Sequence, residues 1–205
     1  MRERETRAVV TSLVACAVVA VLAALTPAGA DENARRDARL QPERVMDAVG
    51  IRPGMVVGEA GAGRGYFTFK LARRVGASGK VYANDIDRGA LDHVRQVSRD
   101  EGIGNVETVV GEVEDPLFPV AGLEVVVMVY AIHDFARPAA FLGNLKKYLK
   151  PGGTVAVLDQ DPDASGDHHF LTRERLVALF AESGYELARD ERFLEKDLLL
   201  VFRPS

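Results

Sequence analysis

Short apolar runs alternate along most of the chain with longer segments in which apolar residues recur every three or four positions. Runs of the first kind predict buried strands, and segments of the second kind predict amphipathic helices. The expected strands are 55–57, 80–83, 105–110, 123–129 and 155–158. The expected helices between them are 66–75, 88–101, 138–149 and 172–183. Strands that alternate with helices in this way predict a parallel sheet covered by helices on both faces.

The two ends of this region have their own patterns. Residues 41–49 carry Val45, Met46 and Val49 at helical spacing, and Gly50 stops this segment, so we expect a helix before the first strand. Residues 185–193 and 198–202 are expected to be two strands around a short turn. A hairpin here predicts that these two strands pair antiparallel to each other.

The first thirty residues differ from the rest of the chain. Arginines precede an apolar run over residues 8–25, and Ala28-Gly29-Ala30 ends the segment. This layout is typical of a secretory signal peptide cleaved after Ala30, which predicts export to the periplasm or the extracellular space. The alternative is an uncleaved membrane anchor formed by residues 8–25. The charged residues 31–40 then predict a flexible linker, and residues 41–205 the folded domain.

A glycine-rich turn follows the first expected strand. After the acidic residue Glu59 come Gly61, Gly63 and Gly65 on alternate positions, and then a helical pattern. In this arrangement the backbone can approach a ligand closely at the start of a helix. The spacing G-x-G-x-G differs from the G-x-G-x-x-G of a dinucleotide-binding fold, which argues against a dinucleotide oxidoreductase.

This E-x-G-x-G-x-G segment resembles motif I of class I S-adenosylmethionine-dependent methyltransferases. The turn Leu149-Lys150-Pro151-Gly152-Gly153 resembles a second signature of the same family. The resemblance covers about residues 41–203. It implies an α/β three-layer sandwich with a Rossmann-like seven-stranded sheet, mostly parallel with an antiparallel last strand, and S-adenosyl-L-methionine as cofactor.

The resemblance also implies which residues meet the cofactor. An acid after the second strand, Asp85, lies one strand–helix unit beyond the glycine turn, where it can accept from the ribose hydroxyls. Asp87 is expected to cap the next helix instead. Glu112 stands where family members often have the acid near the adenine amino group. The expected cofactor contacts are Glu59, Gly61, Gly63, Gly65, Tyr66, Asp85, Ile86, Glu112 and Val113.

The segment after the fourth strand carries the candidate catalytic residues. In the family it faces the reactive methyl group, and here it contains Tyr130, His133 and Asp134. We expect the ring of His133 at the mouth of the cleft, with Asp134 orienting it, as a candidate general base. A hydrogen bond to the acceptor or a packing role are the alternatives for this histidine.

No metal site is expected. His168 and His169 are adjacent, so their side chains should point in different directions, and no spacing typical of paired ligands supports them. Contact with the substrate remains open for these two histidines. The only cysteine, Cys16, lies in the first segment, so the predicted domain has no thiolate ligand.

Composition and motifs narrow the possible classes of methyl acceptor. A net charge of −4 argues against nucleic acid as a partner. No [DN]-P-P-[FY] follows the fourth strand, and cytosine C5-methylases or arsenite methylases would need cysteines. The expected function is methyl transfer to a small molecule, such as a quinone-like or lipid-soluble acceptor. The alternative is a non-catalytic ligand-binding module on the same fold. Membrane contact is expected only through the N-terminal segment, and the oligomeric state stays open.

Overall fold

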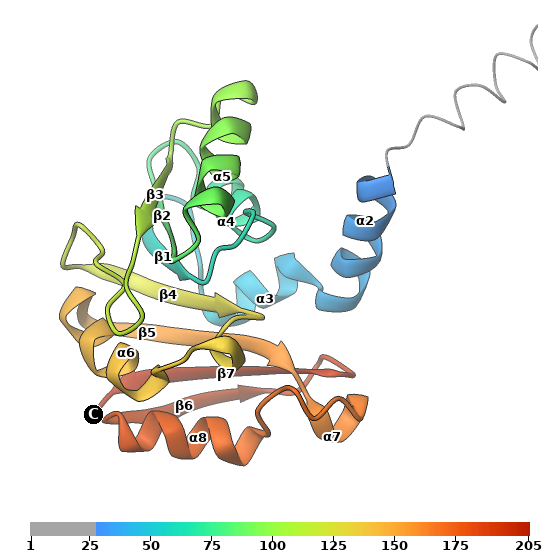
Figure 1. Cartoon of the computed structure of the whole chain (residues 1–205), viewed down its shortest axis with the longest axis vertical. Helices are drawn as coiled ribbons and strands as arrows, with labels where there is room; N and C mark the ends of the chain where they lie inside the picture. The colour runs from blue at the N-terminus through green and yellow to red at the C-terminus, as the bar shows by residue number, and fades with distance from the viewer. Residues whose placement is uncertain (1–27) are drawn as a thin grey trace, which may run out of the picture. The chain divides into compact units, whose positions relative to one another are not determined.

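The computed structural model describes residues 28–205 (Figure 1). The chain divides into two compact units, residues 1–39 and residues 40–205. The apolar run over residues 8–25 lies outside the described residues, so the signal peptide and the membrane anchor stay predictions. No helix among the described residues is both long enough and apolar enough to span a membrane.

The segment expected to be a flexible linker is a helix. Helix α2 spans Ala28–Leu40 and carries charged residues on most of its surface. Alanine, arginine and leucine favour helical backbone, and this segment contains neither an internal proline nor a run of glycines. A charged composition is compatible with a helix, and the role of residues 31–40 as a linker stays a prediction.

The second unit contains a seven-stranded sheet in the order β3-β2-β1-β4-β5-β7-β6. Its strands are β1 (Val56–Ala60), β2 (Lys80–Asp85), β3 (Val106–Val110), β4 (Leu123–Val129), β5 (Leu149–Gln160), β6 (Tyr185–Glu191) and β7 (Asp197–Pro204). Pairing is parallel from β3 through to β5, while β7 runs antiparallel to both β5 and β6. This order confirms the predicted fold class.

Helices cover both faces of the sheet. They are α3 (Pro42–Val49), α4 (Thr68–Val75), α5 (Arg88–Asp100), α6 (Pro138–Leu145) and α8 (Arg173–Glu182). Apolar residues of α3 and α4 pack in one cluster, and Val94 of α5 packs on Ala83 of the same sheet face. Residues of α6 and α8 pack in a cluster on the opposite face. The sheet is therefore the middle layer of three.

Strand β4 shows why the sheet can be buried on both sides. Val125, Val127 and Val129 face the α3–α4 cluster, whereas Val126 and Met128 face the α6–α8 cluster. A strand covered on both faces needs apolar side chains at consecutive positions, which is the pattern seen in the sequence.

The largest differences between the predicted and the observed elements concern the segments around β5 and α6. Strand β5 begins at Leu149, because Leu149 pairs with Leu123, and the register shifts between Leu123 and Val125. The glycine-containing turn is thus part of a long irregular strand. Helix α6 ends at Leu145 and continues as a short 3₁₀ turn, η2 (Lys146–Tyr148), and a short helix, α7 (Pro162–Ser165), lies in the expected polar loop.

Candidate cofactor site and histidine cluster

The glycine turn after β1 has the backbone that its sequence predicts. Gly61, Gly63 and Gly65 all have positive φ, of 79°, 52° and 89°. A Cβ on Gly61 would overlap the side chain of Ala131, whereas a Cβ on Gly63 would meet no protein atom within 4 Å. Gly61 therefore serves close packing between the ends of β1 and β4, and Gly63 leaves its side of the turn open.

Asp85, the last residue of β2, holds the glycine turn. One carboxylate oxygen accepts from the backbone N–H of Gly63 at 2.8 Å, and the other accepts from the N–H of Asp87 at 2.9 Å. Asp87 in turn accepts from the N–H groups of Gly89 and Ala90, which confirms that it caps α5. The two acids thus have the separate positions that the sequence predicts for a ligand-facing group and a helix cap.

A cavity of about 110 Å³ opens at the carboxyl ends of the first four strands. Its lining residues are Gly61, Asn84, Asp85, Ile86, Glu112, Val113, Asp134, Phe135, Ala136 and Phe141. Five of the nine predicted cofactor residues are among them. Ile86 and Val113 are 61% and 46% exposed, which is unusual for large apolar side chains and leaves apolar surface for a flat ligand such as a purine.

The other four predicted cofactor residues lie around this cavity without lining it. Gly63 is linked to the cavity through its backbone N–H, which donates to the lining residue Asp85. Glu59 is only 2% exposed and accepts from the hydroxyl of Thr68. Its carboxylate therefore links β1 to the start of α4 and supports the glycine turn between them. The ring of Tyr66 lies under the ammonium group of Lys70. For all nine predicted residues a direct cofactor contact stays a prediction.

Sequence reasoning missed four lining residues, Asn84, Phe135, Ala136 and Phe141. Asn84 is buried and donates to the carbonyl groups of Val109 and Pro116, which fixes the loop after β3. Phe135 and Phe141 pack edge to face at 4.7 Å and form the wall on the α6 side. Only the aromatic character of position 135, directly after Asp134, could have indicated this wall.

The residues present fit S-adenosylmethionine. A carboxylate suits ribose hydroxyls, apolar side chains suit adenine, and backbone N–H groups of a glycine turn suit a carboxylate of the ligand. The cavity volume is below the roughly 300–1,000 Å³ of typical small-molecule sites. It therefore fits part of such a ligand, with the remainder lying along the open glycine turn.

His133 is more buried than the sequence suggests. It lies in a 3₁₀ turn, η1 (Ile132–Asp134), and its side chain is only 6% exposed, although we expected the ring at the mouth of the cleft. Its Nδ1 atom lies 2.8 Å from the carboxylate of Asp159. Asp159 is fully buried near the end of β5, directly after the apolar residues that predicted this strand.

The surroundings of His133 raise its pKa. Burial by itself lowers the pKa of the imidazole, but the hydrogen bond to Asp159 and the charges of Asp159, Asp134 and Asp167 outweigh that effect. Asp134, which we expected to orient the ring, lies farther away, with 3.4 Å between its Oδ2 and the Nε2 of His133. The main orienting group is therefore Asp159.

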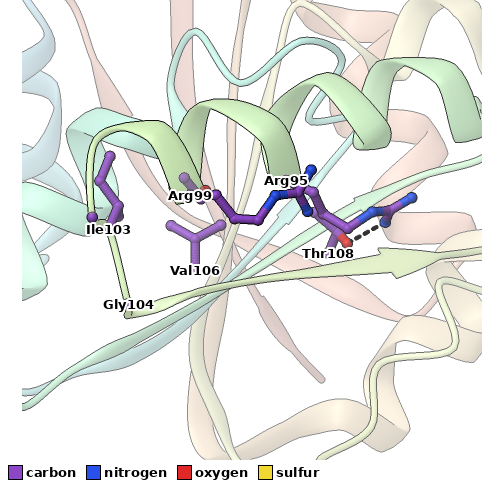
Figure 2. A pocket seen from close by; sticks show the side chains of 8 residues that line it. Arg95, Arg99, Ile103, Gly104, Val106 and Thr108 are labelled. Atoms are coloured by element: carbon purple, nitrogen blue, oxygen red, sulfur yellow. Dashed lines mark hydrogen bonds between the residues drawn. The ribbon is translucent and has the colours of Figure 1, made fainter.

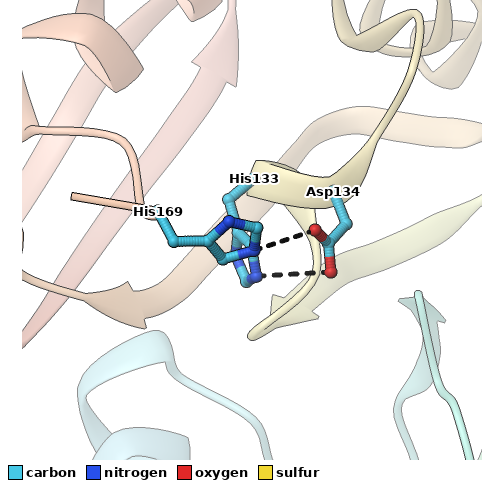
Figure 3. A group of neighbouring side chains, drawn as sticks. All are labelled: His133, Asp134 and His169. Carbon is cyan, nitrogen blue, oxygen red and sulfur yellow. Dashed lines mark hydrogen bonds and ion pairs between the residues drawn. The ribbon is translucent and has the colours of Figure 1, made fainter. Parts of the chain in front are cut away.

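His169, from a distant part of the chain, lies next to His133 and Asp134 (Figure 3). His169 comes from the segment between α7 and α8, and its Nε2 lies 3.1 Å from Oδ1 of Asp134. The rings of His133 and His169 are 5.1 Å apart edge to face, and the ring of Phe170 lies 4.3 Å from that of His133. His168 makes no interaction of this kind in the part of the chain that the structure describes.

Tyr130 lies away from the cofactor cavity. Its φ of 54° is unusual for a residue with a Cβ, and its hydroxyl donates to Asp197 at the start of β7. Its ring also packs edge to face on Phe170 at 5.6 Å. Tyr130 thus supports the segment that carries His169, and a direct part in catalysis stays a prediction.

A larger cavity, of about 440 Å³, lies between α5 and the edge strand β3 (Figure 2). Arg95 and Arg99 line it, but Arg95 donates to Asp92 and Thr108, and Arg99 donates to Gln96. These two cations therefore already have partners on the protein.

Solved structures share this fold. A SAM-dependent methyltransferase from Aquifex aeolicus superposes with a TM-score of 0.76 at 22% identity, over 82% of this chain and 91% of that chain. The seven-stranded sheet and its glycine turn therefore define a Rossmann-like methyltransferase fold.

The sequence comparison gives the family. Residues 51–192 match the model of a methyltransferase domain. The ubiquinone/menaquinone biosynthesis C-methyltransferase UbiE of Vibrio campbellii is 33% identical over 165 residues, which are 75% of this chain and 64% of that protein. The UbiE protein of Shewanella pealeana is 32% identical over 122 residues, which are 59% of this chain and 49% of that protein. The chain belongs to the family of S-adenosylmethionine-dependent methyltransferases.

Proposed function

We propose that the protein transfers the methyl group of S-adenosylmethionine to a small, apolar, quinone-like acceptor. The observation that carries the proposal is the link between Asp85 and Gly63. It sets a carboxylate between the glycine turn and a cavity with exposed apolar walls, as a nucleoside ligand requires. The relatives, which are C-methyltransferases of ubiquinone and menaquinone biosynthesis, support the acceptor class, although the chain spans only about half to two thirds of their length.

Methyl transfer requires the protein mainly to position the two reactants and to exclude water. Bound S-adenosylmethionine supplies an electrophilic methyl group. The acceptor must approach in line with it, and the protein contributes by holding both molecules in a dry cleft. Ile86 and Val113 offer apolar surface to the adenine, and Asp85 binds the ribose. Phe135 lines this cavity directly after Asp134 of the histidine cluster, where an acceptor ring would lie.

His133 is the candidate general base. An acceptor phenol, amine or acidic carbon loses a proton as its new bond to carbon forms, and an imidazole can take it. Asp159 holds Nδ1, so Nε2 is the atom left to receive the proton. Phe170, packed on the ring, keeps water from the same site. An acceptor that is already anionic would need no base.

Calorimetry followed by a methyl-transfer screen tests this function. The protein is titrated with S-adenosylmethionine and with S-adenosylhomocysteine, and then incubated with methyl-labelled cofactor and a panel of demethylated quinols and phenols. We expect binding of both cofactor forms and label in at least one quinol. Failure of both cofactor forms to bind would contradict the proposal.

The competing function is a binding module that holds a ligand without turnover. The predicted export would separate the protein from the cytoplasm, where the cofactor is made, and a fold does not by itself fix an activity. Cofactor binding without label transfer to any member of a broad acceptor panel would favour this second function.

A further inference from the structure

Three potential metal ligands converge at the end of β4 (Figure 3). They are the imidazoles of His133 and His169 and the carboxylate of Asp134, and one ligand atom of each lies within 4.8 Å of the other two. Two residues come from η1, and the third comes from a segment more than thirty positions later. The cluster is distinct from the turn and the acid that would hold the cofactor.

The distances are near those of a coordination sphere. Zinc–nitrogen and zinc–oxygen bonds of about 2.0–2.2 Å place neighbouring ligands of a tetrahedral ion roughly 3.3–3.6 Å apart. The Nε2 atoms of His133 and His169 lie 3.4 Å and 3.1 Å from oxygens of Asp134. These two distances end on different carboxylate oxygens, Oδ2 and Oδ1, and the side chains of Asp134 and His169 are both exposed.

Asp159 gives His133 the support that metal-binding histidines usually have. A ligating histidine almost always donates its other N–H to a carboxylate or carbonyl, which fixes the ring and directs the free nitrogen at the metal. Here the fully buried Asp159 binds Nδ1 at 2.8 Å. Nε2 then faces the carboxylate of Asp134 at 3.4 Å, and either a proton or a metal ion between these two atoms makes the contact attractive.

We propose that His133, Asp134 and His169 bind a divalent transition-metal ion, with Asp159 orienting His133. Two imidazoles and one carboxylate suit zinc, cobalt or iron better than magnesium, which prefers oxygen ligands only. Three protein ligands also leave a coordination position open, as catalytic rather than structural sites do. Asp134 lines the cofactor cavity as well, so the ion would stand at the cavity rim and could bind an oxygen atom of the acceptor.

This inference departs from the sequence-based expectation of no metal. That expectation rested on the adjacency of His168 and His169, which does prevent the two from sharing an ion. Only one of them is used here, and its partners lie in another strand–helix unit. Local spacing cannot reveal ligands that tertiary structure brings together.

Cobalt and zinc are the probes for the test. The full chain, prepared without a histidine tag and stripped with EDTA, is titrated with Co²⁺ while its visible absorption is followed. Zn²⁺ is then added to displace the Co²⁺, and Mg²⁺ is titrated separately. We expect one equivalent of Co²⁺ to give ligand-field absorption that Zn²⁺ abolishes, and Mg²⁺ to have no effect.

Exposed ligands provide variants that should fold. Because the side chains of Asp134 and His169 are 66% and 62% exposed, Asp134→Ala and His169→Ala should retain the wild-type circular dichroism spectrum. His169→Ala should also retain cofactor binding, because His169 does not line the cofactor cavity. Each should weaken Co²⁺ binding at least about 100-fold, since loss of an orienting residue alone typically costs about 10–100-fold. Asp159→Asn should fall within that smaller range.

His168→Ala is the matched control. It removes an exposed histidine next to His169, and Co²⁺ binding should stay within twofold of the wild type. The proposal is overturned if the wild type gives no absorption with Co²⁺, or if His168→Ala and His169→Ala weaken binding equally. Neither result would affect the proposed cofactor site, because cofactor binding is measured separately in the EDTA-treated protein.

Discussion

The carboxylate of Asp85 accepts a 2.8 Å hydrogen bond from the backbone N–H of Gly63, 22 positions earlier in the chain. This bond joins the ends of two neighbouring parallel strands, β1 and β2. It also means that the glycine turn and the acid form one unit, so a change in either should disturb the binding of the same ligand.

Gly63→Ala should leave the fold intact and abolish cofactor binding. A Cβ at this position meets no protein atom within 4 Å, so it would project into the space where a ligand approaches the turn. The positive φ adds backbone strain of about 1 kcal/mol. Calorimetry with S-adenosylmethionine measures the affinity, and a thermal melt measures the fold.

Gly61→Ala is the matched comparison for this variant. Its new methyl group would overlap Ala131, so the free energy of unfolding should fall markedly whether or not a ligand is present. If Gly63→Ala retained wild-type affinity, the glycines would serve the fold alone.

Asp85→Ala should mainly weaken cofactor binding, whereas Asp87→Ala should mainly lower stability. A carboxylate that accepts from ribose hydroxyls contributes roughly 1.5–3 kcal/mol, so Asp85→Ala should weaken cofactor binding by about one to two orders of magnitude. Asp87 caps α5 through Gly89 and Ala90, and its loss should cost about 0.5–2 kcal/mol of stability. An exchange of these two outcomes would contradict the assigned roles.

His133→Ala should lower the turnover of an acceptor that must lose a proton by about 10²–10⁴, with cofactor affinity nearly unchanged. Single-turnover assays with labelled cofactor measure the rate, run once with EDTA and once with added Zn²⁺. The Nε2 atom of His133 can take a proton only while no metal ion is bound to it, so the loss of a general base should be seen in EDTA. A variant with full activity in both conditions would leave positioning as the only catalytic contribution.

Asp115 should make the loop of the cofactor cavity sensitive to acid. Burial by itself raises the pKa of this carboxyl, but hydrogen bonds from Lys147, Tyr148 and the N–H of Leu117 outweigh it and lower the pKa below 3.8. A lowered folded-state pKa contributes stability above the ordinary pKa, and that stability is lost as the pH falls through the folded-state pKa.

Urea unfolding of the wild type and of Asp115→Asn between about pH 6 and about pH 3 tests this contribution. The variant should be less stable near neutral pH, and the difference between the two proteins should shrink as the pH falls below about 4. A constant difference across this range would mean that the Asp115 charge contributes nothing.

The fold and the cofactor side of the site could be predicted because their signals are local. The glycine turn, the acid at Asp85 and the cap at Asp87 each depend on a few consecutive residues. Strand β4 could be predicted because burial on both faces requires an unbroken apolar run. Cavity-lining positions such as Ile86 and Val113 followed from the ends of these strands.

The histidine cluster could not be predicted in the same way. His133, Asp159 and His169 come from three separate segments, and their contacts depend on how the chain after β5 returns across the sheet end. Tyr130 shows a second limit, because its positive φ turns the side chain toward Asp197 rather than the cavity. Nothing in its immediate neighbours indicates that conformation.

The place of β7 in the sheet has a consequence for how the protein is made. The ribosome synthesises β6 before β7, yet β6 joins the sheet only through β7, which pairs with β5 on its other side. Until β7 inserts, both β5 and β6 present unpaired backbone, and such edges pair readily with other chains. The nascent protein should therefore be most prone to aggregate just before this strand emerges, when the cofactor half is already assembled.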